Sequence, residues 1–137
     1  MPQTTLTIDT SGRGLTDITP DISRFVERSG ITTGLCHAFI RHTSASLIIN
    51  ENADSDVQRD LETFLGDLVP DGDPRYVHTA EGPDDMPAHV RTLLTQTSIG
   101  IPIIQGHLAL GTWQGIFLWE HRHRPNQRRI IVTVLDS

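Results

Sequence analysis

After Gly100 the chain consists of short apolar segments joined by short connections, and none of these connections is long and apolar enough to be a helix. This feature constrains the fold most, because a run of strands that does not alternate with helices favours a mainly antiparallel sheet over a doubly wound one. Antiparallel strands need only a turn, such as the one expected at Gln105-Gly106. The C-terminal third is therefore predicted to form antiparallel strands, at residues 101–104, 108–110, 113–119 and 129–135.

The first hundred residues add more strands and three helical patterns. Further strands are predicted at 5–8, 34–41 and 47–49. Thr19-Pro20 is typical of an N-cap followed by proline in the first turn, and Ser29-Gly30 is typical of the end of that helix. A second helix has its predicted apolar stripe at Val57, Leu61, Phe64, Leu65 and Leu68, and a third, opening at Asp84, has its apolar face at Met86, Val90, Leu93 and Leu94.

Strands and helices do not alternate regularly, which favours an α+β fold over a doubly wound one. We therefore predict a single domain over residues 1–137, with a mainly antiparallel, β-sandwich-like sheet and about three helices. Three helices do not cover many strands, so another subunit is expected to cover part of the sheet.

Composition excludes several classes of function. The net charge of −6 argues against a non-specific nucleic-acid binder, and the absence of lysine excludes Schiff-base chemistry and a P-loop. No apolar run approaches the roughly 20 residues that span a bilayer, and the N-terminus lacks a signal-peptide pattern, so we expect a cytoplasmic protein. Cys36 is the only cysteine and lies in an apolar stretch, which favours a buried hydrophobe over a nucleophile.

The seven histidines are the main candidates for chemistry, because imidazole is a common metal ligand and titrates near neutral pH. His42, His78 and His89 each lie beside polar or acidic residues where a predicted element starts or ends. They either converge on one site or are independent surface histidines. His121 and His123 would share one face of a strand, but the flanking arginines are typical of an exposed strand end.

Three other segments carry polar residues with two interpretations each. The acids of residues 50–56 either cap the following helix or orient a liganding histidine. The glycines around Trp113 indicate a bulge or a close approach of backbone to a ligand, and packing is the simplest role for the Trp113 side chain. Arg128-Arg129 is either a solvated pair or an anion clamp.

Signature blocks along nearly the whole chain resemble those of the YjbQ family. The blocks are His42-Thr43-Ser44-Ala45-Ser46-Leu47, Asn50-Glu51-Asn52, Glu81-Gly82, Asp84-Asp85-Met86-Pro87, His89, Gly111-Thr112-Trp113-Gln114-Gly115 and Glu120-His121-Arg122. The resemblance implies a sandwich-like α+β fold assembled as a homotrimer. It also implies a polar pocket near the subunit contacts, where metals or anions bind. The family is often labelled secondary thiamine-phosphate synthase, after a weak activity that joins a pyrimidine diphosphate to a thiazole phosphate.

Carried over residue by residue, the resemblance implies a site for a divalent metal, expected to be zinc, and a small phosphorylated molecule. The metal ligands would be His42, His78 and His89. In the enzyme hypothesis, Glu51, Asp54 or Asp85 would orient a ligand or act as base. Substrate contacts in that hypothesis would come from Thr43, Ser44, Trp113, Gln114, Arg128 and Arg129. Three hypotheses remain. The chain is an enzyme, a non-catalytic trimer that binds a metal or a small molecule, or a protein with a purely structural histidine cluster.

Overall fold

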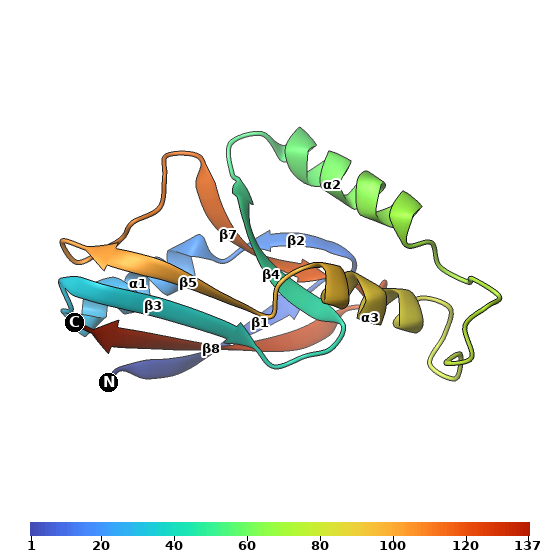
Figure 1. Ribbon diagram of the computed structural model, residues 1–137, viewed down its shortest axis with the longest axis horizontal. Coiled ribbons are helices and arrows are strands. Elements are labelled where there is room, and N and C mark those ends of the chain that lie inside the picture. The colour runs from blue at the N-terminus through green and yellow to red at the C-terminus, as the bar shows by residue number, and fades with distance from the viewer.

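The computed structural model describes all residues, Met1–Ser137, as two antiparallel sheets and three helices (Figure 1). The helices are α1 (Thr19–Ser29), α2 (Ser55–Leu68) and α3 (Asp85–Leu94). The strands are β1 (Gln3–Thr10), β2 (Gly14–Asp17), β3 (Thr33–Ile40), β4 (Ala45–Glu51), β5 (Ser98–Ile104), β6 (His107–Leu108), β7 (Gln114–Glu120) and β8 (Asn126–Asp136). None of the helices is both long and apolar enough to cross a bilayer.

The larger sheet has the strand order β1-β8-β3-β5-β6, and the smaller sheet has the order β2-β7-β4. Every strand pair is antiparallel, as the connections of the C-terminal third predicted. β3 and β4 follow each other in the chain but lie in different sheets, so residues 41–44 carry the chain from one layer to the other. This crossing places His42 and Thr43 at the point where the two sheets meet.

A single apolar core joins the two sheets and α1. The inward residues of β3, β4, β5, β7 and β8 pack with Ile18, Ile22 and Val26, all of which are fully buried. Gly30 ends α1 in the left-handed conformation that the sequence predicted at this position. Cys36 belongs to this core, and burial raises the pKa of its thiol to about 11. The α+β sandwich and the burial of Cys36 are therefore confirmed.

Two local predictions need correction. The strand β2 was missed, because its four residues follow a glycine-rich turn and have no clear alternation. Thr19 is the first helical residue and not the cap, and its hydroxyl accepts a hydrogen bond from the backbone N–H of Ile116 at 2.8 Å. It is thus used to tie α1 to β7.

The predicted apolar faces of α2 and α3 are also only partly correct. α2 buries Leu65 over the smaller sheet, but Phe64 and Leu68 are exposed. α3 presents Arg91 and Asp85 inward and leaves Leu93 81% exposed. The reason is electrostatic pairing, since the buried guanidinium of Arg91 meets Glu62 of α2 at 2.6 Å. Burying this pair rotates α3 away from the orientation that its hydropathy predicts.

Gly34 of β3 tests how closely the strands of the larger sheet pack. A Cβ at this position would lie 2.0 Å from the backbone carbonyl oxygen of Leu135 in β8, so the backbone would have to move. We expect Gly34→Ala to lower the free energy of unfolding by about 1–3 kcal/mol, the usual cost of overpacking. Gly100→Ala in the neighbouring β5 is the matched control, because its Cβ would meet only Leu35 at 3.6 Å. Equal urea midpoints for the two variants would contradict the prediction.

Candidate metal and anion site

His78, Asp85 and His89 form the one group of potential metal ligands in the structure, with ligand atoms that all lie within 4.8 Å of one another. His78 comes from the long loop between α2 and α3. Asp85 and His89 lie one turn apart on α3 and therefore share a face of the helix. Oδ2 of Asp85 lies 2.6 Å from Nε2 of His78 and 3.0 Å from Nε2 of His89. A carboxylate oxygen thus lies between two imidazole nitrogens.

The hydrogen bond of His89 to the backbone determines what its other nitrogen can do. Nδ1 of His89 lies 2.8 Å from the carbonyl oxygen of Thr43, which can only accept, so Nδ1 carries a proton. A neutral His89 then presents the lone pair of Nε2 to the carboxylate of Asp85, and two acceptors face each other. This contact requires either a proton on Nε2 or a cation between the two groups. A metal-binding histidine usually has this arrangement, with its second nitrogen donating to a carbonyl.

Arg122, in the turn after β7, holds the carboxylate side of the cluster. Its Nη1 donates to Oδ1 of Asp85 at 2.7 Å, and its Nε donates to Asp84 at 3.0 Å. Its Nη2 donates to the carbonyl oxygen of Glu81 at 2.9 Å, so one guanidinium anchors the end of the loop that carries His78. The outer oxygen of Asp85 is therefore fixed, and Oδ2 is directed toward the histidines.

Protonation in the cluster follows from these contacts. The hydrogen bond to Asp85 raises the pKa of His78, against a smaller opposing effect of desolvation. Burial would raise the pKa of Asp85, but hydrogen bonds and the neighbouring charges of His89 and Arg122 bring it below its usual value. Asp85 is therefore ionised at neutral pH, as a metal-binding carboxylate must be.

His42 lies apart from this cluster. Its Nε2 accepts the backbone N–H of Arg129 at 2.8 Å, and its Nδ1 faces Nη1 of Arg128 at 3.4 Å, so both ring nitrogens already face donors and neither presents a free lone pair to a metal. Burial and the nearby charge of Arg128 lower the pKa of His42. The structure thus brings together two of the three histidines proposed as ligands and adds Asp85 in place of the third.

Arg128 and Ser44 belong to a buried polar network. Nε of Arg128 donates to Glu120 at 2.8 Å, Nη2 donates to Oγ of Ser44 at 2.9 Å, and the Arg128 side chain is nearly fully buried. From the sequence, Arg128 and Arg129 were interpreted either as a solvated pair or as an anion clamp. Arg128 is neither solvated nor free, because Glu120 neutralises it, whereas Arg129 is exposed and forms no ion pair.

His121 contradicts the expectation of an exposed strand end, because its side chain is fully buried. Its Nε2 lies 2.8 Å from Oγ of Ser46, and its ring lies against Trp119. Burial, reinforced by nearby arginines, lowers the pKa of His121 to about 3, so the ring is neutral at physiological pH. His123 is the exposed member of the pair and contacts Asp71 at 2.8 Å. The two imidazoles therefore do not form a metal site.

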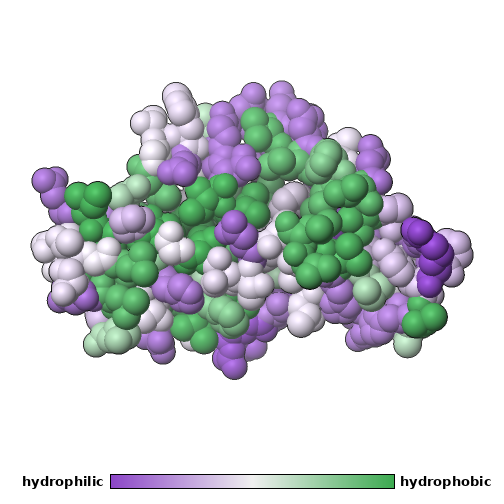
Figure 2. Space-filling model, in the orientation of Figure 1, coloured by the Kyte–Doolittle hydropathy of each residue, from purple (hydrophilic) through white to green (hydrophobic).

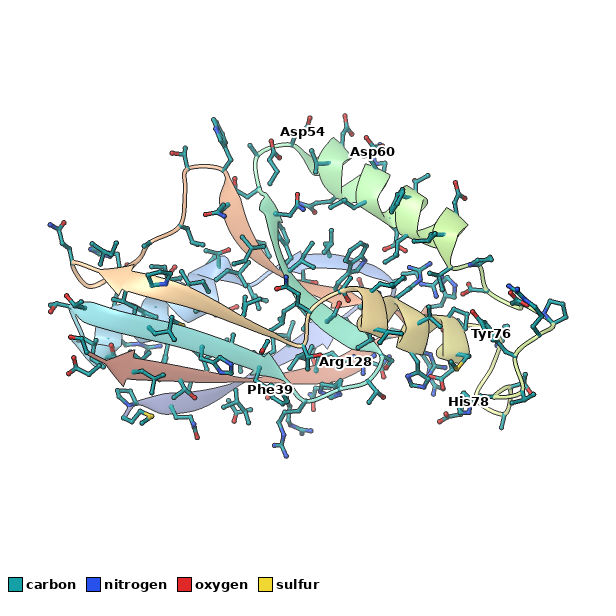
Figure 3. All side chains as sticks on the ribbon, in the orientation of Figure 1. Phe39, Asp54, Asp60, Tyr76, His78 and Arg128 are labelled. Carbon is teal, nitrogen blue, oxygen red and sulfur yellow. The ribbon has the colours of Figure 1, made fainter.

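Four other predicted site residues lie elsewhere, at the far end of the smaller sheet. Glu51 pairs with Gln114 in register, whereas Ala45 pairs with Glu120 at the end near the cluster. Six residues of strand separate the two ends, which is about 20 Å. Oε2 of Glu51 accepts the N–H of Asp54, Asp54 caps α2, and Trp113 is exposed. Figure 3 shows Asp54 at the start of α2 and His78 in the loop beyond its end.

Sequence reasoning missed Arg41, Glu120 and Arg122 as parts of the site region. Arg41 and His42 border both hollows of the surface, and Arg122 and Glu120 hold neighbouring side chains in place. The signal for two of them was present, since Glu120 and Arg122 flank His121 in one signature block. Nothing in the sequence distinguished the exposed Arg41 from other arginines.

Comparison with known proteins gives one consistent result. The family model described as "UPF0047 protein YjbQ-like" matches residues 4–137. The UPF0047 protein sll1880 of Synechocystis is 58% identical over 132 residues, covering 96% of this chain and 90% of the relative. The UPF0047 protein YjbQ of Escherichia coli O157:H7 is 42% identical and covers 96% of both chains.

Solved structures agree with the fold described above. A hypothetical protein from Aeropyrum pernix K1 superposes with a TM-score of 0.91 at 27% identity, covering 100% of both chains. A conserved protein of the YjbQ/UPF0047 family from Clostridium acetobutylicum gives a TM-score of 0.82 at 36% identity, covering 98% of this chain and 100% of the other. The similarity therefore extends over the whole domain.

Proposed function

The chain belongs to the YjbQ-like UPF0047 family, and we propose that its His78–Asp85–His89 cluster binds a divalent metal that acts on a small phosphorylated molecule. One observation carries this proposal. Because Nδ1 of His89 donates to the carbonyl of Thr43, a neutral His89 would direct the lone pair of Nε2 at the ionised carboxylate of Asp85, 3.0 Å away. A cation between the three groups would turn this unfavourable contact into a favourable one.

The donor set fits zinc. Two imidazoles and one carboxylate are the protein ligands of several catalytic zinc sites, which leave a further position for water or substrate. When bound, zinc would supply a Lewis acid for a phosphoryl oxygen and lower the pKa of a bound water. The chain's own residues prepare the site. The carbonyl of Thr43 fixes the tautomer of His89, and Arg122 orients Asp85.

Phosphorylated substrates are supported by the positive charge beside the cluster. Arg41 and Arg129 border a hollow together with His42, and neither arginine is paired with a carboxylate. Pyrimidine diphosphate and thiazole phosphate both belong to this class, so we propose thiamine-phosphate synthesis as a side activity of the site. Rescue of a thiamine auxotroph by the wild-type chain but not by His89→Ala would support it, whereas equal rescue would contradict a role for His89.

Assembly as a homotrimer is part of the same proposal. Exposed apolar side chains such as Phe64, Leu68 and Ile104 support it, because association would remove them from water. A non-catalytic binding trimer is the alternative to the enzyme. It would bind metal and phosphorylated ligand without turnover, and light scattering coupled to size exclusion would report the mass of the assembly in either case.

Metal analysis of protein purified without a histidine tag tests the proposal. We expect one zinc ion per chain in the wild type and only traces in His78→Ala. His107→Ala is the matched control, because His107 is an exposed histidine that contacts only Glu27 and lies outside the cluster. Equal metal content in His78→Ala and His107→Ala would show that the cluster does not hold the metal.

A further inference from the structure

A groove of about 800 Å³ runs along α3 where β3 ends, and it reaches His89 of the cluster. The side chains of Phe39 and Leu93 line it, and they are 41% and 81% exposed. Figure 2 shows a broad hydrophobic area over α3 in the same region of the surface. Large apolar side chains that line a hollow beside polar groups are typical of small-molecule sites. The groove thus offers an apolar wall next to the proposed metal ligands.

A second hollow of about 210 Å³ adjoins the groove, and none of the residues that line it is hydrophobic. Its three residues are Arg41, His42 and Arg129, and the first two also line the larger groove. Nε2 of His42 accepts the N–H of Arg129 at 2.8 Å, and its Nδ1 faces Nη1 of Arg128 at 3.4 Å, so both ring nitrogens are already in contact with donors. The donors that this small space offers to a ligand are therefore the two guanidinium groups of Arg41 and Arg129.

The charges in the two hollows differ from those of the whole chain. The chain has a net charge of −6, yet no carboxylate lines either hollow. Seven of the eleven arginines form ion pairs with carboxylates, whereas Arg41 and Arg129 form none. On a protein with an excess of acids, two adjacent unpaired guanidiniums favour an anionic ligand, which they can bind through two parallel hydrogen bonds.

We propose that the groove binds a phosphate monoester with an apolar or aromatic body, with the phosphate at Arg41 and Arg129 and the body against Phe39 and Leu93. The proposal rests on the proposed function for the class of ligand, and it narrows that class to amphipathic anions. It makes Arg41 the main anion contact, a role that the buried and neutralised Arg128 does not have. It also gives a function to the exposed Leu93, which the folding of α3 does not require.

Binding of phenyl phosphate to the full chain after removal of metal with EDTA tests this proposal. Isothermal titration should show tighter binding of phenyl phosphate than of inorganic phosphate or phenol, because only the monoester uses both halves of the groove. Arg41→Gln should weaken binding of phenyl phosphate about tenfold or more, the effect of losing a charged hydrogen bond. Leu93→Ser should reduce the preference for phenyl phosphate over phosphate.

Arg124→Gln is the matched control, since Arg124 is also exposed and unpaired but lies outside both hollows. Equal affinities of Arg41→Gln and Arg124→Gln, or no preference for phenyl phosphate over phosphate in the wild type, would overturn the proposal. The metal-free assay keeps it separate from the proposed function. Loss of zinc binding with intact phenyl phosphate binding would remove the metal site and leave this inference, and the opposite result would remove this inference and leave the metal site.

Discussion

Replacement of Glu120 by alanine is expected to lower the free energy of unfolding by about 3–5 kcal/mol, the cost of leaving a buried charge without its partner. Glu120 is fully buried, and its Oε1 accepts hydrogen bonds from Arg128 at 2.8 Å and Thr10 at 2.7 Å. Without this carboxylate, Arg128 would keep its positive charge in a site that is only 5% exposed. Urea denaturation at pH 7, followed by tryptophan fluorescence, measures the loss.

The double variant Glu120→Leu with Arg128→Met separates the unpaired charge from the loss of packing. Removing both charges is often neutral or stabilising where removing one is costly, so the double variant should be clearly more stable than Glu120→Ala. A loss of less than about 1 kcal/mol in Glu120→Ala, within the range of exposed pairs, would show that Arg128 reaches water.

The same pair predicts the response to acid. Burial would raise the pKa of Glu120, but hydrogen bonds from Arg128, Thr10 and the backbone of Arg122 bring it below its usual value. A carboxyl with a lowered pKa in the folded state adds stability above its unfolded pKa of about 4.3, and this stability is lost as the pH falls through the folded pKa. The difference in stability between wild type and Glu120→Gln should therefore shrink below about pH 4.3.

The fold could be predicted to a large extent because its signals are local. Alternation along β1, the proline and glycine at the ends of α1, and the run of strands after Gly100 each depend on neighbouring residues. These features led to antiparallel strands and three helices without knowledge of the tertiary structure. What they did not reveal is that β3 and β4 enter different sheets, because residues 41–44 have no pattern that distinguishes a bend within a sheet from a crossing between two.

The predicted orientation of α3 was wrong for a different reason. Hydropathy predicts that Leu93 points inward and Arg91 outward, and the structure has the reverse. Arg91 is buried because Glu62, 29 residues earlier, lies opposite it on α2. His121 was likewise predicted to be exposed from its arginine neighbours, but Arg122 bonds to Asp84, 38 residues away. Pairings of this length cannot be read from the residues beside each group.

The candidate site contains features that local sequence predicts and features that depend on distant residues. His89 and Asp85 are four residues apart on a helix, so their common face follows from the sequence. His78 joins them because Arg122 binds Glu81 and Asp85 together and thereby fixes the end of its loop. His42 differs from the other two because its Nε2 accepts the N–H of Arg129, a contact that depends on the end of β8. The resemblance of the sequence blocks indicated which residues matter, and their hydrogen bonds indicate which of them have a lone pair for a metal.

Asp85→Asn is expected to weaken zinc binding by more than about 100-fold, because loss of an outer partner alone costs about 10–100-fold and Asp85 is a proposed ligand. The substitution keeps the size of the side chain but removes its charge and one acceptor oxygen. It also removes the only carboxylate that both His78 and His89 contact. Competition titration against a chromophoric zinc chelator at pH 7.5 measures the affinity.

Asp84→Asn is the matched control, since Asp84 is the adjacent carboxylate, is also bound by Arg122, and lies outside the cluster. It should affect zinc binding only through the position of Arg122, and hence far less than Asp85→Asn. Protons compete with the metal for His78, whose pKa is raised by Asp85, so the wild-type affinity should fall as the pH is lowered through that pKa. Equal affinities in the two asparagine variants would mean that Asp85 serves only to anchor Arg122, and that the metal, if bound, is held by other residues.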